Sequence, residues 1–157
     1  MQIYEKIYEE VSKLTIIDTH EHLPEKESSR SKNTDFFREY LIHYFNRDLI
    51  SGGFNPEMFG LLYDDTKSVE EKFLHVEKYW NQCRYTGYGQ VLDIAVQGLY
   101  GINGININTV GEIDFKIKES IGKEHFKYVL QEKSKIEKGV LCRAEAMDCD
   151  REFFVPT

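Results

Sequence analysis

The sequence predicts an α/β protein with a parallel sheet. Two short segments, 14–18 and 140–147, are typical of strands. The first is rich in β-branched residues and should be buried, and the second alternates small apolar with charged residues. The long stretch between them has apolar residues at helical spacing. Two strands separated by helices indicate a right-handed parallel crossover and not a hairpin. We therefore expect the two strands to be parallel neighbours.

The first strand is preceded by an amphipathic helix. Ile3, Ile7, Val11 and Leu14 recur at helical spacing with charged residues between them, which predicts a helix over 3–14. The segment Leu14-Thr15-Ile16-Ile17-Asp18 follows without a break and is typical of a buried strand of a parallel sheet. Pro24 ends any continuation of this strand.

Between the strands, apolar spacing and capping signals predict a series of helices. A wide aromatic stripe from Phe36 to Phe45 indicates a helix, and we interpret this stripe as core or interface. Ser68 with Glu71, and Thr109 with Glu112, have the spacing of capping boxes, so each pair should start a helix. The expected helices are 34–51, 56–62, 68–85, 91–100, 109–121 and 123–137.

The second strand alternates small and charged residues. Side chains of a strand point alternately to its two faces, so one face should be small and apolar and the other charged. The first face would carry Val140, Cys142, Ala144 and Ala146, and the second Arg143 and Glu145.

Composition limits the class of protein. A chain of 157 residues fits one domain, here 1–157, and its 41% hydrophobic content is enough for a core. The net charge of -7, with thinly spread Lys and Arg, argues against nucleic-acid binding. No apolar run approaches the roughly 20 residues that span a bilayer, and the N-terminus lacks the pattern of a signal peptide. We expect a cytoplasmic protein that does not bind membranes.

The three cysteines, Cys83, Cys142 and Cys149, form no CxxC pair. This fits reduced thiols better than a disulfide framework. Because the sequence shows no base beside any of them, we expect none to be a nucleophile.

The segment Asp18-Thr19-His20-Glu21-His22 is the motif that carries chemistry. Residues i and i+2 of a strand point to the same side, so His20 and His22 can direct ring nitrogens at one cation. Imidazole suits Zn, and also Mn or Fe. Asp18 could orient a ligand or brace the strand end as an outer-shell carboxylate. Since chance gives an HxH in roughly one such chain in six, the preceding apolar strand matters more than the tripeptide, and a solvated His-Glu-His turn is the alternative.

The segment Ile16-Ile17-Asp18-Thr19-His20-Glu21-His22-Leu23 resembles the first-strand signature of the amidohydrolase superfamily. The resemblance implies a (β/α)8 barrel, of the TIM type, whose strand-1 HxH binds one or two divalent metals. By this resemblance His20 and His22 are metal ligands. More loosely, 84–89 with Ala95 and 99–101 is similar to the helical insertion after strand 1 in the amidohydrolase-related branch, which includes relatives of uronate isomerases.

The resemblance implies that this chain is the N-terminal part of such a barrel, with a mainly helical insertion at about 34–138 between strands 1 and 2. A complete barrel needs about 250 residues, so we expect the remaining ligands and the general base to lie beyond Thr157. His43, His75 and His125 fall on predicted helices and are interpreted as surface or packing residues. Arg84, at a predicted helix end, is a candidate for binding a substrate carboxylate, against the alternative of a cation that stabilises the helix dipole.

The expected function is metal-dependent hydrolysis of an amide, ester or lactone carbonyl in a small-molecule substrate, with water activated by the metal. Two alternatives stay open: a uronate-isomerase-like aldose–ketose isomerase, and a truncated, non-catalytic metal-binding or interaction domain. The sequence leaves homo-oligomerisation open.

Overall fold

The computed structural model describes residues 2–41, 43–142 and 148–156. The chain divides into two compact units. Unit 1 combines Met1–Arg30 with Gly122–Thr157, and unit 2 is the continuous segment Ser31–Ile121. The inserted helical segment that the sequence predicts at about 34–138 overlaps all of unit 2 except its first three residues, and it also extends into unit 1.

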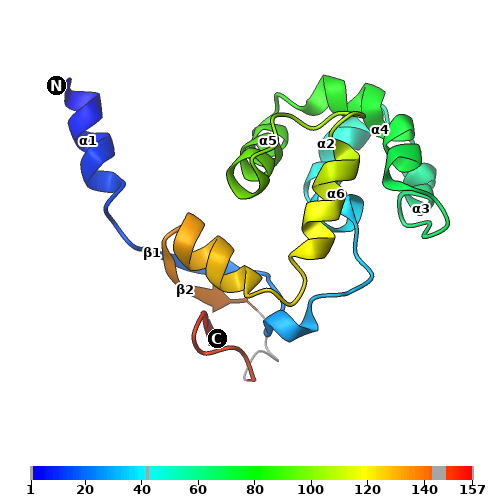
Figure 1. Ribbon diagram of the computed structural model, residues 1–157. Helices are drawn as coiled ribbons and strands as arrows, with labels where there is room; N and C mark the ends of the chain where they lie inside the picture. The colour runs from blue at the N-terminus through cyan, green and yellow to red at the C-terminus, as the bar shows by residue number, and fades with distance from the viewer. Residues whose placement is uncertain (1, 42, 143–147, 157) are drawn as a thin grey trace. The chain divides into compact units, whose positions relative to one another are not determined.

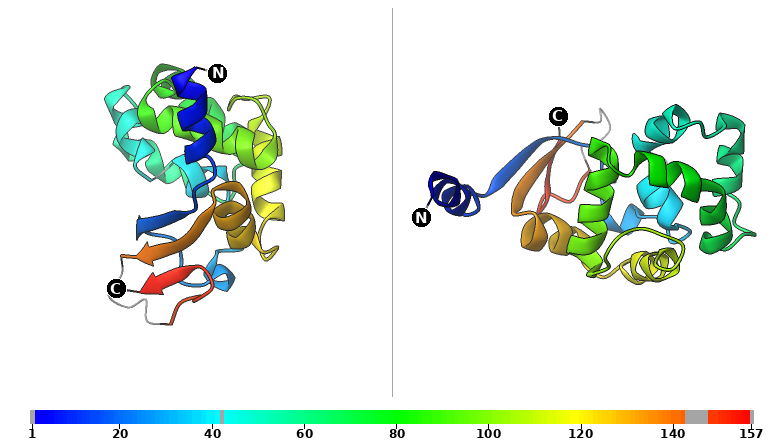
Figure 2. Two further views of the ribbon diagram at one scale, coloured as in Figure 1. Left: turned by 90° about the vertical axis from the view of Figure 1, so that its left-hand side faces the viewer. Right: turned by 90° about the horizontal axis from the view of Figure 1, so that it is seen from above.

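Unit 1 contains a three-stranded parallel sheet. Its strands are β1 (Ile16–Glu21), β2 (Ile136–Leu141) and β3 (Phe154–Pro156), hydrogen-bonded in the order β1-β2-β3 (Figure 2). The prediction that the first two strands are parallel neighbours is confirmed, with Asp18 opposite Gly139 and Glu21 opposite Leu141. The third strand is not predicted by the sequence. The fold class is α/β.

The first strand differs from its prediction in position and in burial. β1 begins two residues later and ends three residues later than expected. Ile16 and Ile17 remain 48% and 53% exposed. Within the described residues β1 pairs with β2 alone, so it forms an edge of the sheet. The preceding helix α1 (Ile3–Val11; Figure 1) forms but ends three residues before the predicted end at Leu14, and none of its residues is buried. The expectation of a buried first strand is therefore wrong for this part of the chain.

The second strand begins four residues earlier than predicted. The expected helix 123–137 is reduced to a π-helical segment, η4 (Lys127–Lys133). Lys135 then adopts a left-handed conformation with φ of 54°, which ends the helical path. Its carbonyl accepts a hydrogen bond from the Ile16 amide at 2.8 Å and so begins the pairing of β1 with β2. The predicted faces at 143–147, including Arg143 and Glu145, lie outside the described residues.

A small aromatic core holds the sheet of unit 1. Leu141, Phe154 and Phe126 are almost fully buried. The Phe126 ring meets the Phe154 ring edge to face at 5.5 Å between centroids. A Cβ at Gly139 would lie 3.3 Å from the Phe154 ring, so glycine lets β3 pack tightly against β2. This packing fixes β2, the strand that Cys142 directly follows.

Unit 2 is helical. The predicted capping box at the start of α4 (Val69–Cys83) is confirmed, because the Glu71 amide donates to Ser68 Oγ and the Ser68 amide donates to Glu71 Oε2. The second predicted capping box is wrong, since Thr109 makes no side-chain cap and its hydroxyl donates to the Gly104 carbonyl. The helices are η2 (Phe37–Leu41), α2 (Phe45–Ser51), η3 (Pro56–Met58), α3 (Phe59–Leu62), α4 (Val69–Cys83), α5 (Gly87–Tyr100) and α6 (Val110–Glu119); η1 (Glu27–Ser29) belongs to unit 1.

Trp80 on α4 is the centre of the core of unit 2. Its side chain is fully buried, and its indole N–H donates to the Ile105 carbonyl at 2.8 Å. Phe45 packs on it at 5.3 Å between ring centroids. The predicted aromatic stripe mostly enters this core, although Tyr44 is exposed.

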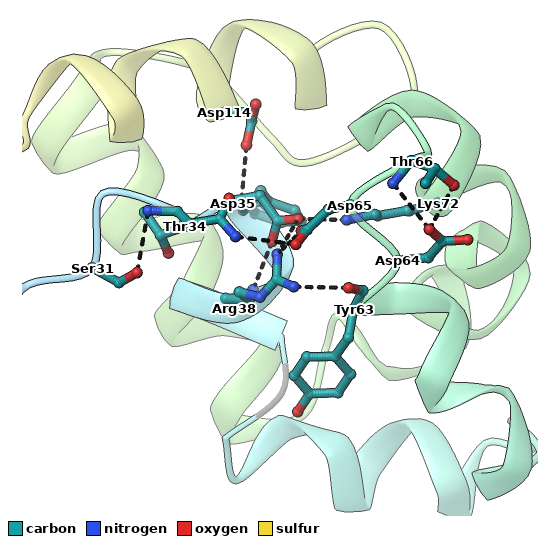
Figure 3. A network of polar contacts seen from close by, with 12 residues as sticks. Ser31, Thr34, Asp35, Arg38, Tyr63, Asp64, Asp65, Thr66, Lys72 and Asp114 are labelled. Atoms are coloured by element: carbon teal, nitrogen blue, oxygen red, sulfur yellow. Dashed lines mark hydrogen bonds and ion pairs between the residues drawn. The ribbon is translucent and has the colours of Figure 1, made fainter.

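A polar network joins the start of the helical unit to α4 (Figure 3). The buried ammonium of Lys72 contacts Asp35 Oδ2 at 2.6 Å. Asp35 also accepts from the Arg38 amide at 2.9 Å, and Arg38 continues the network to Asp65 at 2.7 Å. Arg38 Nη2 donates to the Tyr63 carbonyl as well. The network therefore fixes the segment before η2 against the loop that precedes α4.

Candidate metal centre

Two imidazole rings meet at the carboxyl end of β1. His20 is in the last part of the strand and His22 directly follows it. Their Nε2 atoms lie 2.9 Å apart, and the ring centroids lie 4.7 Å apart with the rings nearly perpendicular. The prediction that the HxH spacing brings both rings to one side is confirmed. Both residues are exposed, so solvent ions can reach them.

The separation of the two nitrogens fits a shared cation. Two nitrogens each about 2.0–2.1 Å from a metal are about 2.9 Å apart at a 90° angle and about 3.3 Å apart at a tetrahedral angle. The observed 2.9 Å matches the smaller angle, and a slight opening of the rings gives the tetrahedral one. Among the described residues no group of three or more His, Cys, Asp or Glu side chains is placed to hold a metal. The pair therefore offers two ligands, and the role of these histidines as ligands stays a prediction.

Two carboxylates fix the backbone that carries the rings. Asp18 Oδ1 accepts a hydrogen bond from the His20 amide at 3.0 Å. Glu21 Oε1 accepts from the His22 amide at 2.6 Å and from the Leu23 amide at 3.0 Å. Of the two roles proposed for Asp18, the contacts correspond to bracing of the strand end. Glu21, to which the sequence assigns no role, closes the turn after the strand.

A third side chain reaches the histidine pair from the neighbouring strand. Cys142 directly follows β2, and its Sγ lies 2.9 Å from His20 Nδ1. Its amide donates to the Glu21 carbonyl at 3.1 Å, so the end of β2 is fixed beside the end of β1. The sequence shows no base beside any cysteine, but the structure places His20 beside Cys142. The expectation that no cysteine is a nucleophile stays a prediction. The strand alternation marks Cys142 as one face of β2, but only the pairing register reveals its neighbour.

Arg84 has structural partners in unit 2. Its Nη2 contacts Asp93 Oδ2 at 2.9 Å, and its guanidinium lies over the rings of Trp80 and Tyr85 at 5.8 and 5.7 Å. Asp93 in turn accepts from the Ile105 amide at 3.1 Å. These contacts link the end of α4 to α5 and to the following loop. Its predicted contact with a substrate carboxylate stays a prediction.

The other three histidines are separate from this pair. His43 and His75 are exposed, as expected for surface residues. His125 is partly buried in unit 1, and its amide donates to Glu27 Oε1 at 2.6 Å. Burial, with a smaller repulsion from the Arg30 guanidinium, lowers the pKa of His125 to about 4, against the opposing attraction of Glu27.

The low pKa of His125 predicts acid sensitivity of unit 1. The imidazole takes up a proton near pH 6.5 when unfolded and near pH 4 when folded, so the unfolded state binds more protons between these values. The stabilisation is complete above about pH 6.5 and is lost as the pH falls toward 4. We expect His125→Gln to reduce the slope of the unfolding free energy against pH in this window, by the amount that corresponds to nearly one proton bound on unfolding. Denaturant titrations at several pH values measure it; an unchanged slope, or the same change in His75→Gln, would contradict the assignment.

None of the helices in the described residues has the length and apolar character needed to cross a membrane.

Known proteins offer no independent guide to this site. No protein-family model, no curated protein and no solved structure matches the chain.

Proposed function

We propose that residues 16–22 contribute two ligands to the divalent metal centre of a hydrolase with a (β/α)8 barrel. The observation that carries the proposal is the convergence of His20 Nε2 and His22 Nε2 at 2.9 Å. Zn²⁺ is the preferred occupant for two imidazole nitrogens, with Mn²⁺ or Fe²⁺ as alternatives. The substrate class is a small molecule with an amide, ester or lactone carbonyl.

The arrangement of the strands supports this proposal. The three strands are parallel and lie in sequence order, β1-β2-β3, which is the order of consecutive strands in a (β/α)8 barrel. His20, His22 and Cys142 all lie at the carboxyl ends of their strands. This is the edge where enzymes with such barrels have their active sites.

The residues of this chain hold and orient the centre. A metal bound there would lower the pKa of a water ligand and polarise a substrate carbonyl. His20 and His22 supply neutral nitrogens, while Asp18 and Glu21 hold the backbone of both ligands in place. The described residues assign no general base, so proton transfer from the water depends on groups that complete the site.

Zinc titration tests the proposal. We expect the wild-type chain to bind about one Zn²⁺ weakly, because two imidazoles leave most positions to water. His22→Ala should abolish this binding, and the exposed control His75→Ala should not. Isothermal titration calorimetry measures both. Equal binding by His22→Ala and wild type would contradict the site.

Hydrolysis assays separate the hydrolase from the alternatives. We expect the 157-residue chain with Zn²⁺ to give no turnover on a panel of amide, ester and lactone substrates, because its described residues assign no general base. The whole protein that carries this segment should show metal-dependent hydrolysis that His20→Ala removes. Metal binding without turnover in that protein would favour a non-catalytic domain, and interconversion of aldoses and ketoses would favour the isomerase.

A further inference from the structure

Cys142 is held rigidly beside the first histidine of the pair. The parallel register sets Glu21 opposite Leu141, so the residue after each strand end lies next to its counterpart. The hydrogen bond from the Cys142 amide to the Glu21 carbonyl fixes the cysteine backbone at 3.1 Å. From there Sγ reaches His20 Nδ1 at 2.9 Å. Backbone pairing therefore determines this contact between two residues that are 122 positions apart.

The two nitrogens of the His20 ring face different partners. Nδ1 faces the sulfur of Cys142, and Nε2 faces Nε2 of His22. A neutral imidazole carries one N–H, so one nitrogen donates and the other accepts. If the proton is on Nδ1, His20 donates to the sulfur and its Nε2 lone pair is free to accept. His22 Nε2–H then donates across the 2.9 Å contact, and each N–H has an acceptor.

The opposite assignment also pairs both contacts. The thiol of Cys142 then donates to Nδ1, and Nε2–H of His20 donates to His22. A thiol is both a weak donor and a weak acceptor, so the sulfur contact alone fits either assignment. A metal between the rings needs a lone pair on Nε2 of both histidines, and the proton of His20 must then be on Nδ1, where Cys142 Sγ is its acceptor.

We propose that Cys142 is a positioning residue that holds His20 as the Nδ1–H tautomer, with Nε2 directed at the metal position. The inference rests on the proposed function for its metal, although the tautomer itself can be observed without one. In metal-bound histidines, the ring nitrogen that does not bind the metal commonly donates its hydrogen to a carboxylate, a backbone carbonyl or water. This contact fixes the ring and raises the basicity of the ligand. Here the acceptor is a sulfur from the neighbouring strand, in place of the more usual carboxylate or carbonyl.

The same geometry argues against Cys142 as a direct ligand beside the two histidines. Its sulfur contacts His20 on the edge of Nδ1, whereas the position shared with His22 is on the edge of Nε2. One imidazole ring cannot turn both nitrogens toward one metal. The sulfur therefore acts through His20.

Nitrogen NMR of the histidine rings tests the tautomer in the metal-free chain. Long-range couplings to the ring carbon protons report which nitrogen of His20 carries the proton. We expect Nδ1–H in the wild type, the same tautomer in Cys142→Ser, whose hydroxyl oxygen can also accept, and a shift toward Nε2–H in Cys142→Ala. The exposed His75 ring gives an internal control that should not change. An unchanged His20 tautomer in Cys142→Ala would overturn the proposal.

Metal titration of the same variants tests the consequence for binding. Loss of an outer-shell partner typically lowers metal affinity 10–100-fold, so Cys142→Ala should bind Zn²⁺ about 10-fold more weakly or worse, with Cys142→Ser between it and the wild type. With Co²⁺ in the wild type we expect no sulfur-to-cobalt charge-transfer band; such a band would show direct ligation and overturn the positioning role. If the wild type binds no metal while its tautomer still depends on Cys142, the proposed function fails and the positioning of the ring stands.

Discussion

Replacing Lys72 by alanine is expected to lower the free energy of unfolding of unit 2 by about 3–5 kcal/mol. The Lys72 side chain is only 2% exposed and contacts Asp35 Oδ2 at 2.6 Å. Alanine leaves the Asp35 carboxylate buried with less compensation, and removal of one member of a buried ion pair costs far more than the pair itself contributes. Arg38 stays close to Asp35 at 3.4 Å and offsets part of the loss, so the lower end of the range is the expected value.

The single tryptophan makes this experiment selective. Trp80 is in unit 2, so its fluorescence during denaturant unfolding reports that unit alone. Lys78→Ala is the matched control on the same helix. Lys78 is exposed and its ammonium lies 5.6 Å from the centroid of the Tyr79 ring, so its loss should change the unfolding free energy by less than about 1 kcal/mol. A loss below about 1 kcal/mol for Lys72→Ala would show that water or Arg38 fully compensates Asp35.

Trp80→Ala is expected to have an effect of at least the same size, about 3–5 kcal/mol. The substitution empties the centre of the core between Phe45 and the loop at Ile105, and it removes the hydrogen bond to the Ile105 carbonyl. Circular dichroism must follow unfolding, because the fluorescent probe is lost. A loss below about 2 kcal/mol would show that the surrounding side chains collapse into the space.

Two further variants separate the loss of the hydrogen bond from the loss of apolar packing. Trp80→Phe keeps most of the apolar contact but leaves the Ile105 carbonyl without its indole donor, which costs about 1–3 kcal/mol when the acceptor is buried. Tyr85→Ala, at an exposed aromatic next to the end of α4, is the control and should cost no more than about 1 kcal/mol, because it loses only the exposed contact of its ring with Arg84. A tyrosine effect as large as that of Trp80 would contradict the assignment of the core.

Local signals in the sequence predict the helices well where capping and spacing agree. Ser68 and Glu71 specify the start of α4 through two short-range hydrogen bonds, and the structure shows both. Thr109 and Glu112 have the same spacing, but Thr109 has competing acceptors in the preceding turn and bonds to Gly104 instead. The same spacing therefore gives a cap at Ser68 and none at Thr109, whose hydroxyl bonds to the preceding turn.

The strands are harder to predict at their ends. Residues 136–139, Ile-Glu-Lys-Gly, are too few and too polar to show a strand period, so the predicted helix extends over the first two of them. Their strand conformation comes from pairing with β1, which local sequence does not encode. β3 has only three residues and owes its conformation to pairing with Gly139, Val140 and Leu141.

The candidate site also has one contact that local sequence predicts and others that it does not. The pairing of His20 with His22 follows from the two-residue period of a strand and could be predicted. The contact of Cys142 with His20 depends on the register between distant strands, and the backbone role of Glu21 depends on the shape of the turn after β1. Neither has a local signal.

The division of unit 1 into two chain segments has a consequence for the order of folding. β1 and β2 meet at Ile16 and Ile136, which are 136 − 16 = 120 positions apart, with all of unit 2 between them. Closing so long a loop is entropically costly, and contacts at large sequence separation form slowly. Unit 2 is continuous and helical, so it can fold first and shorten the loop that the strands must close. The histidine pair and its cysteine neighbour should therefore come together last during folding and separate first when the chain opens locally.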